Sequence, residues 1–324
     1  MNDFTRPKVV ISRCLGFEAC RYNGQMIRND LVEALKPHVD FITPCPEMDI
    51  GLGVPRYPIR LIQIDDKLKF LQPSTGREIT KEMKAFCDEF LGELQDVDGF
   101  ILKAKSPSCG IGTVKIYGDL KNLANFRKGN GFFGKEVISR FKGKAIEDET
   151  RLLNPRIRDH FLKKIFTFAA FRKIKYKGDI KALIDFQAQN KLLLMSYSQK
   201  ELKNLGRIVA SYKKRNLDLI FKDYQNHLEL AFIKGSTYKS NINVLQHAFG
   251  YVSKKLSKQE KNFFLDSLEM YREDRTPLQS CISMLSSWII RFDIEYLDNQ
   301  SFFSPYPSEL VIGFEQDRRR DYWE

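Results

Sequence analysis

The spacing of apolar residues changes near residue 155, and this change constrains the fold of the 324-residue chain more than any other feature. Before it, short apolar runs such as residues 8–13 and Gly99–Leu102 alternate with segments of helical spacing such as residues 78–94. Strands that alternate with helices predict a parallel or mixed sheet with helices on both faces. After it, one segment of helical spacing follows another, which predicts an all-α region.

The sequence therefore predicts two domains and a connection between them. We expect an α/β domain with a Rossmann-like sheet over residues 1–155, a connecting helix and basic linker over 156–180, and an all-α domain over 181–310. Residues 311–324, which include the arginines at 318–320, are expected to form an irregular tail. The expected strands are 8–13, 39–42, 65–70, 99–102 and 114–117. The expected helices are 25–35, 78–94, 135–141, 156–172, 180–193, 199–215, 217–234, 237–256, 258–273 and 277–291.

Composition excludes several classes of protein. Hydrophobic residues make up 43% of the chain and charged residues 29%, which is neither disordered nor membrane-embedded. The longest apolar runs, such as residues 192–195, are far shorter than the ~20 residues of a membrane-spanning helix. The first residues lack the pattern of a secretion signal, and six cysteines are too few for a disulfide scaffold. We therefore expect a cytoplasmic protein without a membrane partner.

Positive charge is concentrated in one part of the chain. The net charge is +12, yet residues 1–150 carry only +2, whereas residues 151–261 carry 24 basic and 8 acidic side chains, a net of +16. A basic segment joined to a nearly neutral domain indicates a polyanionic partner. The alternative from composition alone is a lysine-rich surface with no such partner.

Three cysteines lie just beyond predicted strands. Cys14 follows the first strand, Cys45 the second, and Cys109 the strand at residues 99–102. Sites in such sheets form at the carboxyl ends of strands, so the three thiols converge if these strands are neighbours. Three thiolates would hold a metal or an iron–sulfur cluster with one position open. The alternative is three buried, inert thiols, because no CxxC spacing is present. Cys87 and Cys281 are predicted to be core residues, and the role of Cys20 stays open.

Polar residues in the same loops are candidates for catalysis and binding. Glu47, two residues after Cys45, is the candidate acid or base, or else a loop-capping carboxylate. Ser106 and Ser108 flank Pro107, and either one orients or protonates a reacting atom, or only forms turn hydrogen bonds. The candidates for substrate binding, whose alternative role is that of solvated side chains, are Arg21, Tyr22, Arg56, Lys103 and Lys105.

Several strings of residues resemble known families. CLGFEACRYNG, PCPEMDIGLGVPR and LKAKSPSCG resemble the signature segments of the thiouracil desulfidase (TudS-like) family. NKLLLMSYSQKELKNLGRIVASY, NINVLQHAFGY and SPYPSEL resemble a helical YbgA-like domain. In this order the two resemble the two-domain tRNA 4-thiouridine desulfidases of the RudS type, from about residue 7 to residue 310.

This resemblance implies a cofactor and a reaction. The family binds a [4Fe-4S] cluster through three cysteines and leaves one iron free, and the matching residues here are Cys14, Cys45 and Cys109. It also implies a catalytic Glu, matched by Glu47, and a catalytic Ser, which is Ser106 or Ser108. The implied reaction is hydrolytic: water replaces the sulfur at C4 of 4-thiouridine, giving uridine and sulfide without net redox change.

The helical domain is then the expected tRNA-binding part. Its basic residues suit phosphates, whose contacts give affinity rather than sequence choice. Asn243, Gln246 and His247 share one helix face, which is expected to bind nucleotide or to form an interdomain contact. Two other functions stay open. One is a desulfidase for free thiouracil or thionucleotides, and the other is a non-catalytic, cluster-containing protein that binds RNA or senses redox state. No obligatory protein partner is inferred.

Overall fold

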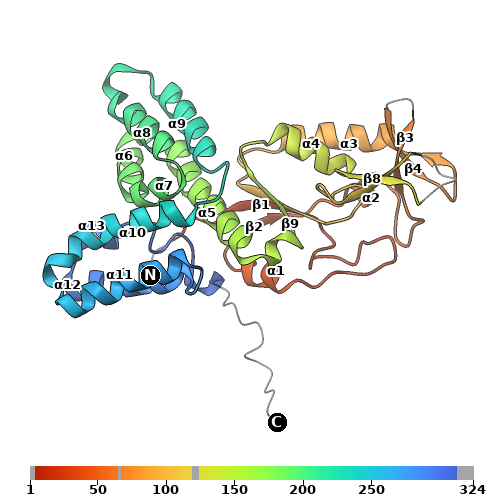
Figure 1. The fold of residues 1–324 in the computed structure, drawn as a ribbon. Coiled ribbons are helices and arrows are strands. Elements are labelled where there is room, and N and C mark those ends of the chain that lie inside the picture. Colours follow the sequence, from red (N-terminus) through yellow and green to blue (C-terminus); the bar gives the residue numbers. More distant parts are fainter. Residues whose placement is uncertain (1–3, 65–66, 119–123, 312–324) are drawn as a thin grey trace, which may run out of the picture. The chain divides into compact units, whose positions relative to one another are not determined.

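A computed structural model describes residues 4–64, 67–118 and 124–311 (Figure 1). The chain forms two compact units. The first unit contains the residues up to Ala169 together with those from Pro307 onward, and the second unit is Ala170–Tyr306. The first unit is α/β and the second is helical, as the change in apolar spacing predicts. Most of the predicted tail, including the arginines at 318–320, lies outside the described residues.

One sheet of the first unit is entirely parallel. Its strand order is β2(Asp40–Ile42)-β1(Lys8–Ile11)-β6(Gly99–Leu102)-β9(Ala145–Asp148), and every neighbouring pair is parallel. All four residues of β6 are buried, and so are the last three of β1. Such continuous burial is typical of strands that are covered on both faces. Because β2, β1 and β6 are neighbours, their carboxyl ends lie at one edge of this sheet.

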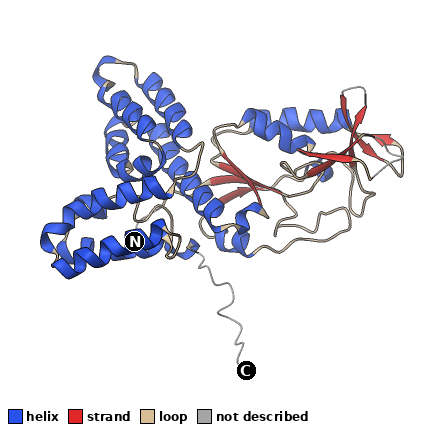
Figure 2. Cartoon of the chain, viewed as in Figure 1, coloured by secondary structure: helices blue, strands red, loops and turns tan. Residues whose placement is uncertain are grey.

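A second sheet of the first unit is mixed (Figure 2). Its order is β5(Arg77–Glu78)-β4(Lys67–Gln72)-β3(Arg60–Ile64)-β7(Val114–Tyr117)-β8(Phe126–Gly129), with only β3 and β7 parallel. The apolar pattern predicted β7 and most of β4, whose expected first residues at 65–66 lie outside the described chain. It missed β3, β5, β8 and β9. In β8 three of the four residues are exposed, so that strand has no apolar alternation to detect.

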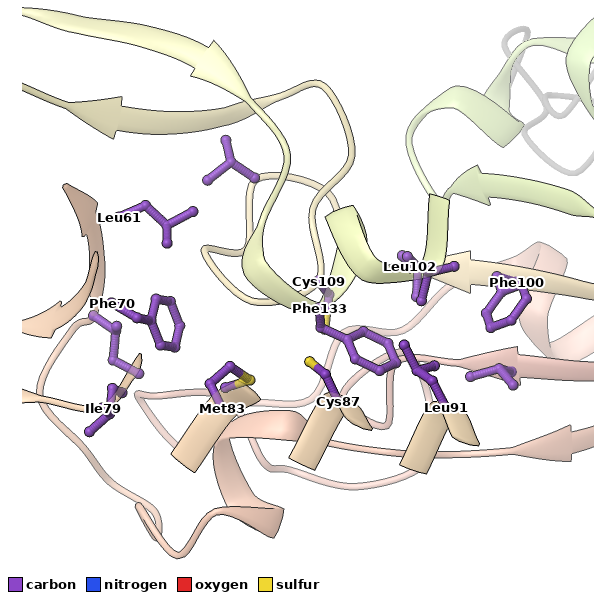
Figure 3. Close-up of a cluster of buried hydrophobic side chains, with 14 of the residues drawn as sticks. Leu61, Phe70, Ile79, Met83, Cys87, Leu91, Phe100, Leu102, Cys109 and Phe133 are labelled. Carbon is purple, nitrogen blue, oxygen red and sulfur yellow. The ribbon is translucent and has the colours of Figure 1, made fainter. Parts of the chain in front are cut away.

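Two helices pack together over the core of the first unit. These are α3(Thr80–Glu93) and α4(Phe132–Arg140) (Figure 1). Figure 3 shows Met83, Cys87 and Leu91 of α3 pointing toward Phe133 of α4. Cys87 is fully buried, which confirms that it is a core residue. Two short helices complete the unit: α1(Asp30–Leu35), which is shorter than the helix expected at 25–35, and α2(Pro46–Asp49), which was not predicted.

The helical half begins with α5(Pro155–Lys177), which runs from one unit into the other. The basic linker expected at the end of the 156–180 connection is helical through residue 177, because residues 172–177 form the last turns of α5. The helix expected at 180–193 is interrupted at Asn190, whose side chain donates to the carbonyl of Phe186. The helices of the second unit are α6(Ile180–Gln189), α7(Lys191–Tyr197), α8(Gln199–Ala210), α9(Leu217–Ala231), α10(Tyr238–Val252), α11(Lys258–Arg272), α12(Leu278–Phe292) and α13(Glu295–Asp298). Among the described residues, no helix has the length and apolar character needed to cross a bilayer.

Candidate active site

The three predicted cysteines lie in loops at the carboxyl edge of the parallel sheet. Cys14 follows β1, Cys45 follows β2 and Cys109 lies in the loop after β6. Cys45 lies near Cys109 and contributes to the raised pKa of that thiol, and Cys20 hydrogen-bonds both Cys45 and Cys14. All are free thiols, and Cys20, Cys45 and Cys109 are buried. Cys45 therefore has both Cys20 and Cys109 as neighbours, and Cys20 has Cys14 as a neighbour.

Cys20 is a fourth member of this group. It is only 1% exposed, and its hydrogen bond with Cys14 and its burial raise its pKa to about 11. The hydrogen bond that Cys45 donates to Cys20, together with burial, likewise raises the pKa of Cys45, and burial raises the pKa of Cys109. These thiols keep their protons unless a cation replaces them. In the part of the chain that the structure describes, no group of three or more His, Cys, Asp or Glu side chains is arranged to hold a metal ion.

Glu47 lies on α2 beside the thiols and has two partners. Its side chain is 12% exposed. The hydroxyl of Ser108 donates to Glu47 Oε1 at 2.6 Å. Arg56 Nε donates to Glu47 Oε2 at 2.7 Å, and Arg56 Nη2 lies 2.6 Å from the same oxygen. The carboxylate is thus held from both sides, with one oxygen on a serine and the other on an arginine.

The two candidate serines have different roles in the structure. The hydroxyl of Ser106 accepts from the backbone N–H groups of Ser108 at 3.3 Å and Cys109 at 3.1 Å, so it closes the turn around Pro107. Ser108 is fully buried and hydrogen-bonds Glu47. The sequence left this choice open, and the contacts place Ser108, not Ser106, on the carboxylate.

The loop that carries Ser108 and Cys109 is fixed against the start of α4. The backbone N–H groups of Phe132 and Gly134 donate to the carbonyls of Pro107 and Ser108, both at 3.0 Å. A Cβ at Gly131 would lie 2.5 Å from the Ser108 carbonyl oxygen, so only glycine allows this approach. Figure 3 shows Cys109 beside Phe133, the second residue of α4.

The basic residues of the predicted binding set differ in exposure. Arg56 is paired with Glu47, and Lys103 forms an ion pair with Glu149 and donates to the carbonyl of Ala104 at 2.9 Å. Both charges are therefore neutralised inside the domain. Of the rest of the predicted set, Tyr22 (44% exposed) and Lys105 are exposed, and Arg21, which lies over the ring of Tyr22, is half-buried.

Sequence reasoning did not single out Ser12 or Glu149. Ser12 is buried, hydrogen-bonds the Cys109 thiol and accepts from the backbone N–H of Lys103 at 2.9 Å. Glu149 accepts from the backbone N–H of Ala104 at 2.7 Å. Their only signal in the sequence is position, because both lie just after strands of the parallel sheet.

The predicted polar face of the second unit lies on α10. Gln246 and His247 are exposed there, whereas Asn243 is half-buried. The Nδ2 atom of Asn243 is buried and has no hydrogen-bond partner within residues 4–64, 67–118 and 124–311. The structure therefore leaves Gln246 and His247 accessible to a partner.

The fold and the site define an α/β domain with a thiol, serine and glutamate centre at a parallel-sheet edge, followed by a helical domain. Residues 9–149 match the family described as 2-thiouracil desulfurase. Residues 191–307 match the family described as protein of unknown function DUF1722. These two matches agree with the expected resemblance to a thiouracil desulfidase domain followed by a YbgA-like domain.

Individual relatives each cover part of the chain. Uncharacterized protein YbgA of Escherichia coli (strain K12) is 25% identical over 159 residues, which is 48% of this chain and 94% of that protein. Uncharacterized protein YbbK of Bacillus subtilis (strain 168) is 26% identical over 113 residues, which is 33% of this chain and 75% of that protein. A solved structure described as [4Fe-4S]-dependent thiouracil desulfidase TudS is 28% identical, with a TM-score of 0.38, and covers 46% of this chain and 94% of that one.

Proposed function

We propose that the protein is a [4Fe-4S]-dependent desulfidase that hydrolyses 4-thiouridine in tRNA to uridine and sulfide. The observation that carries this proposal is the Ser108–Glu47 hydrogen bond beside the thiols of Cys45 and Cys109, in a domain that matches the 2-thiouracil desulfurase family. The reaction adds the oxygen of water to C4 and releases the sulfur as sulfide, so no electrons are gained or lost.

The donor set suits an iron–sulfur cluster. Thiolates are the soft ligands that such clusters use, and a four-iron cluster takes them on different irons, unlike a single ion. Cys14, Cys45 and Cys109 would hold the cluster, and their position as free thiols in the loops after β1, β2 and β6 supports this assignment. When bound, the cluster supplies an open iron that acts as a Lewis acid toward the thiocarbonyl sulfur.

The remaining chemistry is proton transfer by this chain's own residues. Because Ser108 donates its proton to Glu47 Oε1, its oxygen keeps lone pairs that accept a proton from an attacking water. Glu47 is then the base, and Ser108 relays the proton to it. The same pair, with Glu47 protonated, returns the proton to the departing sulfur.

The exposed face of α8 supports binding of tRNA. Lys200, Lys203 and Arg207 are exposed at a spacing of three and four residues, which places them on one face of the helix. The carboxylate of this helix, Glu201, is buried and binds His227 Nδ1 at 2.6 Å. The face therefore presents net positive charge, which suits the phosphate backbone of RNA.

The experiment is anaerobic incubation of cluster-loaded protein with bulk bacterial tRNA. The nucleosides of the digested tRNA are then quantified together with the released sulfide. Matching loss of 4-thiouridine and gain of uridine and sulfide supports the proposal. Turnover of free 2-thiouracil without loss from tRNA would instead support the second candidate, a free-base desulfidase, which the description of the matching family favours. No turnover of either substrate with a full cluster would overturn both.

A further inference from the structure

We propose that Arg56 is a positioning residue, which orients the Glu47 carboxylate so that Oε1 faces Ser108. This inference rests on the proposed function, in which Glu47 receives the proton through Ser108. Arg56 contacts Glu47 Oε2 through two atoms: Nε at 2.7 Å and Nη2 at 2.6 Å. The other oxygen, Oε1, is left to the hydroxyl of Ser108 at 2.6 Å. By binding Oε2, Arg56 leaves Oε1 of Glu47 to accept the hydrogen bond from Ser108.

Arg56 is itself held rigidly. Its Nη1 atom donates to the carbonyl of Gly53 at 2.9 Å and to that of Cys20 at 3.1 Å. Its backbone N–H donates to the carbonyl of Tyr22 at 2.9 Å. Because the guanidinium is planar, fixing Nη1 also fixes Nε and Nη2. The position of Glu47 is therefore tied to the loop that carries Cys20.

Burial excludes a direct role of Arg56 with substrate phosphate. Its side chain is 4% exposed, and its donors are already used by Glu47 and by backbone carbonyls. A lysine would supply the charge but not the fork of donors, since its ammonium acts as a point charge. Substituting Arg56 with lysine therefore separates the effect of its positive charge from its effect on the orientation of Glu47.

The test is a double-mutant cycle with Arg56→Gln, Glu47→Gln and the double variant, assayed on tRNA and on free 2-thiouracil. We expect Arg56→Gln to lower kcat about 100-fold with KM nearly unchanged, as for groups that orient catalytic residues. In the Glu47→Gln background the same change should alter kcat less than about 3-fold, because Arg56 acts through Glu47. Equal losses in both backgrounds would overturn the positioning role.

Arg56→Lys and a distant arginine complete the design. Arg56→Lys keeps the charge and should recover at most about a tenth of the lost activity, since it lacks the planar fork. Full recovery would show that charge alone suffices and would overturn the proposal. Arg140→Gln removes an arginine from an exposed ion pair with Asp88 and Glu136 and should leave kcat unchanged.

Two readouts do not depend on activity. Iron and sulfide content should be equal in all variants, because none of the substituted residues is a proposed ligand. Arg56→Gln leaves a buried carboxylate without its partner and should lower Tm by roughly 10 °C, and adding Glu47→Gln should restore part of this loss. Tm changes that simply add would contradict the coupling of the pair. An inactive wild type with a full cluster would overturn the proposed function, whereas an additive kcat cycle in an active protein would overturn only the role of Arg56.

Discussion

Gly131 gives the sharpest test of how the site is built. It is the N-cap residue of α4, and an added Cβ would lie 2.5 Å from the Ser108 carbonyl oxygen and 2.7 Å from the Ser108 carbonyl carbon. Both are backbone atoms, so no side chain can rotate away. Restoring an ordinary separation requires the loop to move by roughly 0.5–1 Å, and such a shift of catalytic groups costs about 100-fold in rate.

The same clash predicts a loss of stability. Overpacking of this kind costs about 1–3 kcal/mol, which corresponds to roughly 2–10 °C in Tm for a domain of this size. Gly131→Ala should therefore lower Tm, lower kcat about 100-fold and reduce the iron content after reconstitution, because Cys109 moves with Ser108. Thermal unfolding, turnover of 2-thiouracil and iron analysis measure the three effects.

Gly92→Ala is the matched control. Gly92 lies in α3, and a Cβ there meets nothing within 4 Å. Alanine should raise stability by about 0.5–1 kcal/mol through its helix propensity and leave kcat unchanged. If Gly131→Ala behaves like this control in Tm, iron content and turnover, the close approach of loop and helix does not position the site.

Three further results are expected. Ser108→Ala should lower kcat about 100- to 1,000-fold with cluster content unchanged, whereas Ser106→Ala should mainly cost about 1 kcal/mol of stability; equal effects on kcat would contradict the distinction. Burial lowers the pKa of His160 to about 4 from the ordinary 6.5, with Lys164 adding to this and Asp159 opposing it. The folded state therefore excludes a proton that the unfolded chain binds, and stability is lost as the pH falls from about 6.5 toward 4. Urea unfolding should show the wild type losing about 2 kcal/mol more than His160→Gln over this range, and parallel losses would refute the assignment. Reversing charge with Lys203→Glu and Arg207→Glu should weaken tRNA binding and flatten its salt dependence while free 2-thiouracil turns over normally; unchanged binding would exclude the α8 face.

Periodicity and strand ends already predict much of the fold and of the site. The apolar run of β6 and the helical spacing of apolar residues in α3 each depend on the burial of a single element. Both elements can therefore be predicted from the sequence. Because parallel strands end at one edge, the placement of Cys14, Cys45 and Cys109 just after strands predicts that they converge if those strands are neighbours, and β2, β1 and β6 are neighbours in the sheet. Strands with exposed residues, such as β8, show no apolar pattern, and the sequence did not predict them.

Contacts between distant segments are what only the tertiary structure decides. Ser106 and Ser108 are equivalent in a linear reading of the turn around Pro107, and packing of that turn against α4 selects Ser108 for Glu47. Arg56 resembles a solvent-exposed phosphate ligand in the sequence, yet burial beside Glu47 makes it the carboxylate's partner. Local sequence thus determines which groups reach the sheet edge. The contacts among these groups depend on tertiary packing, which brings together side chains that are far apart in the sequence. Burial selects paired arrangements, because an unpaired buried charge or hydroxyl is costly.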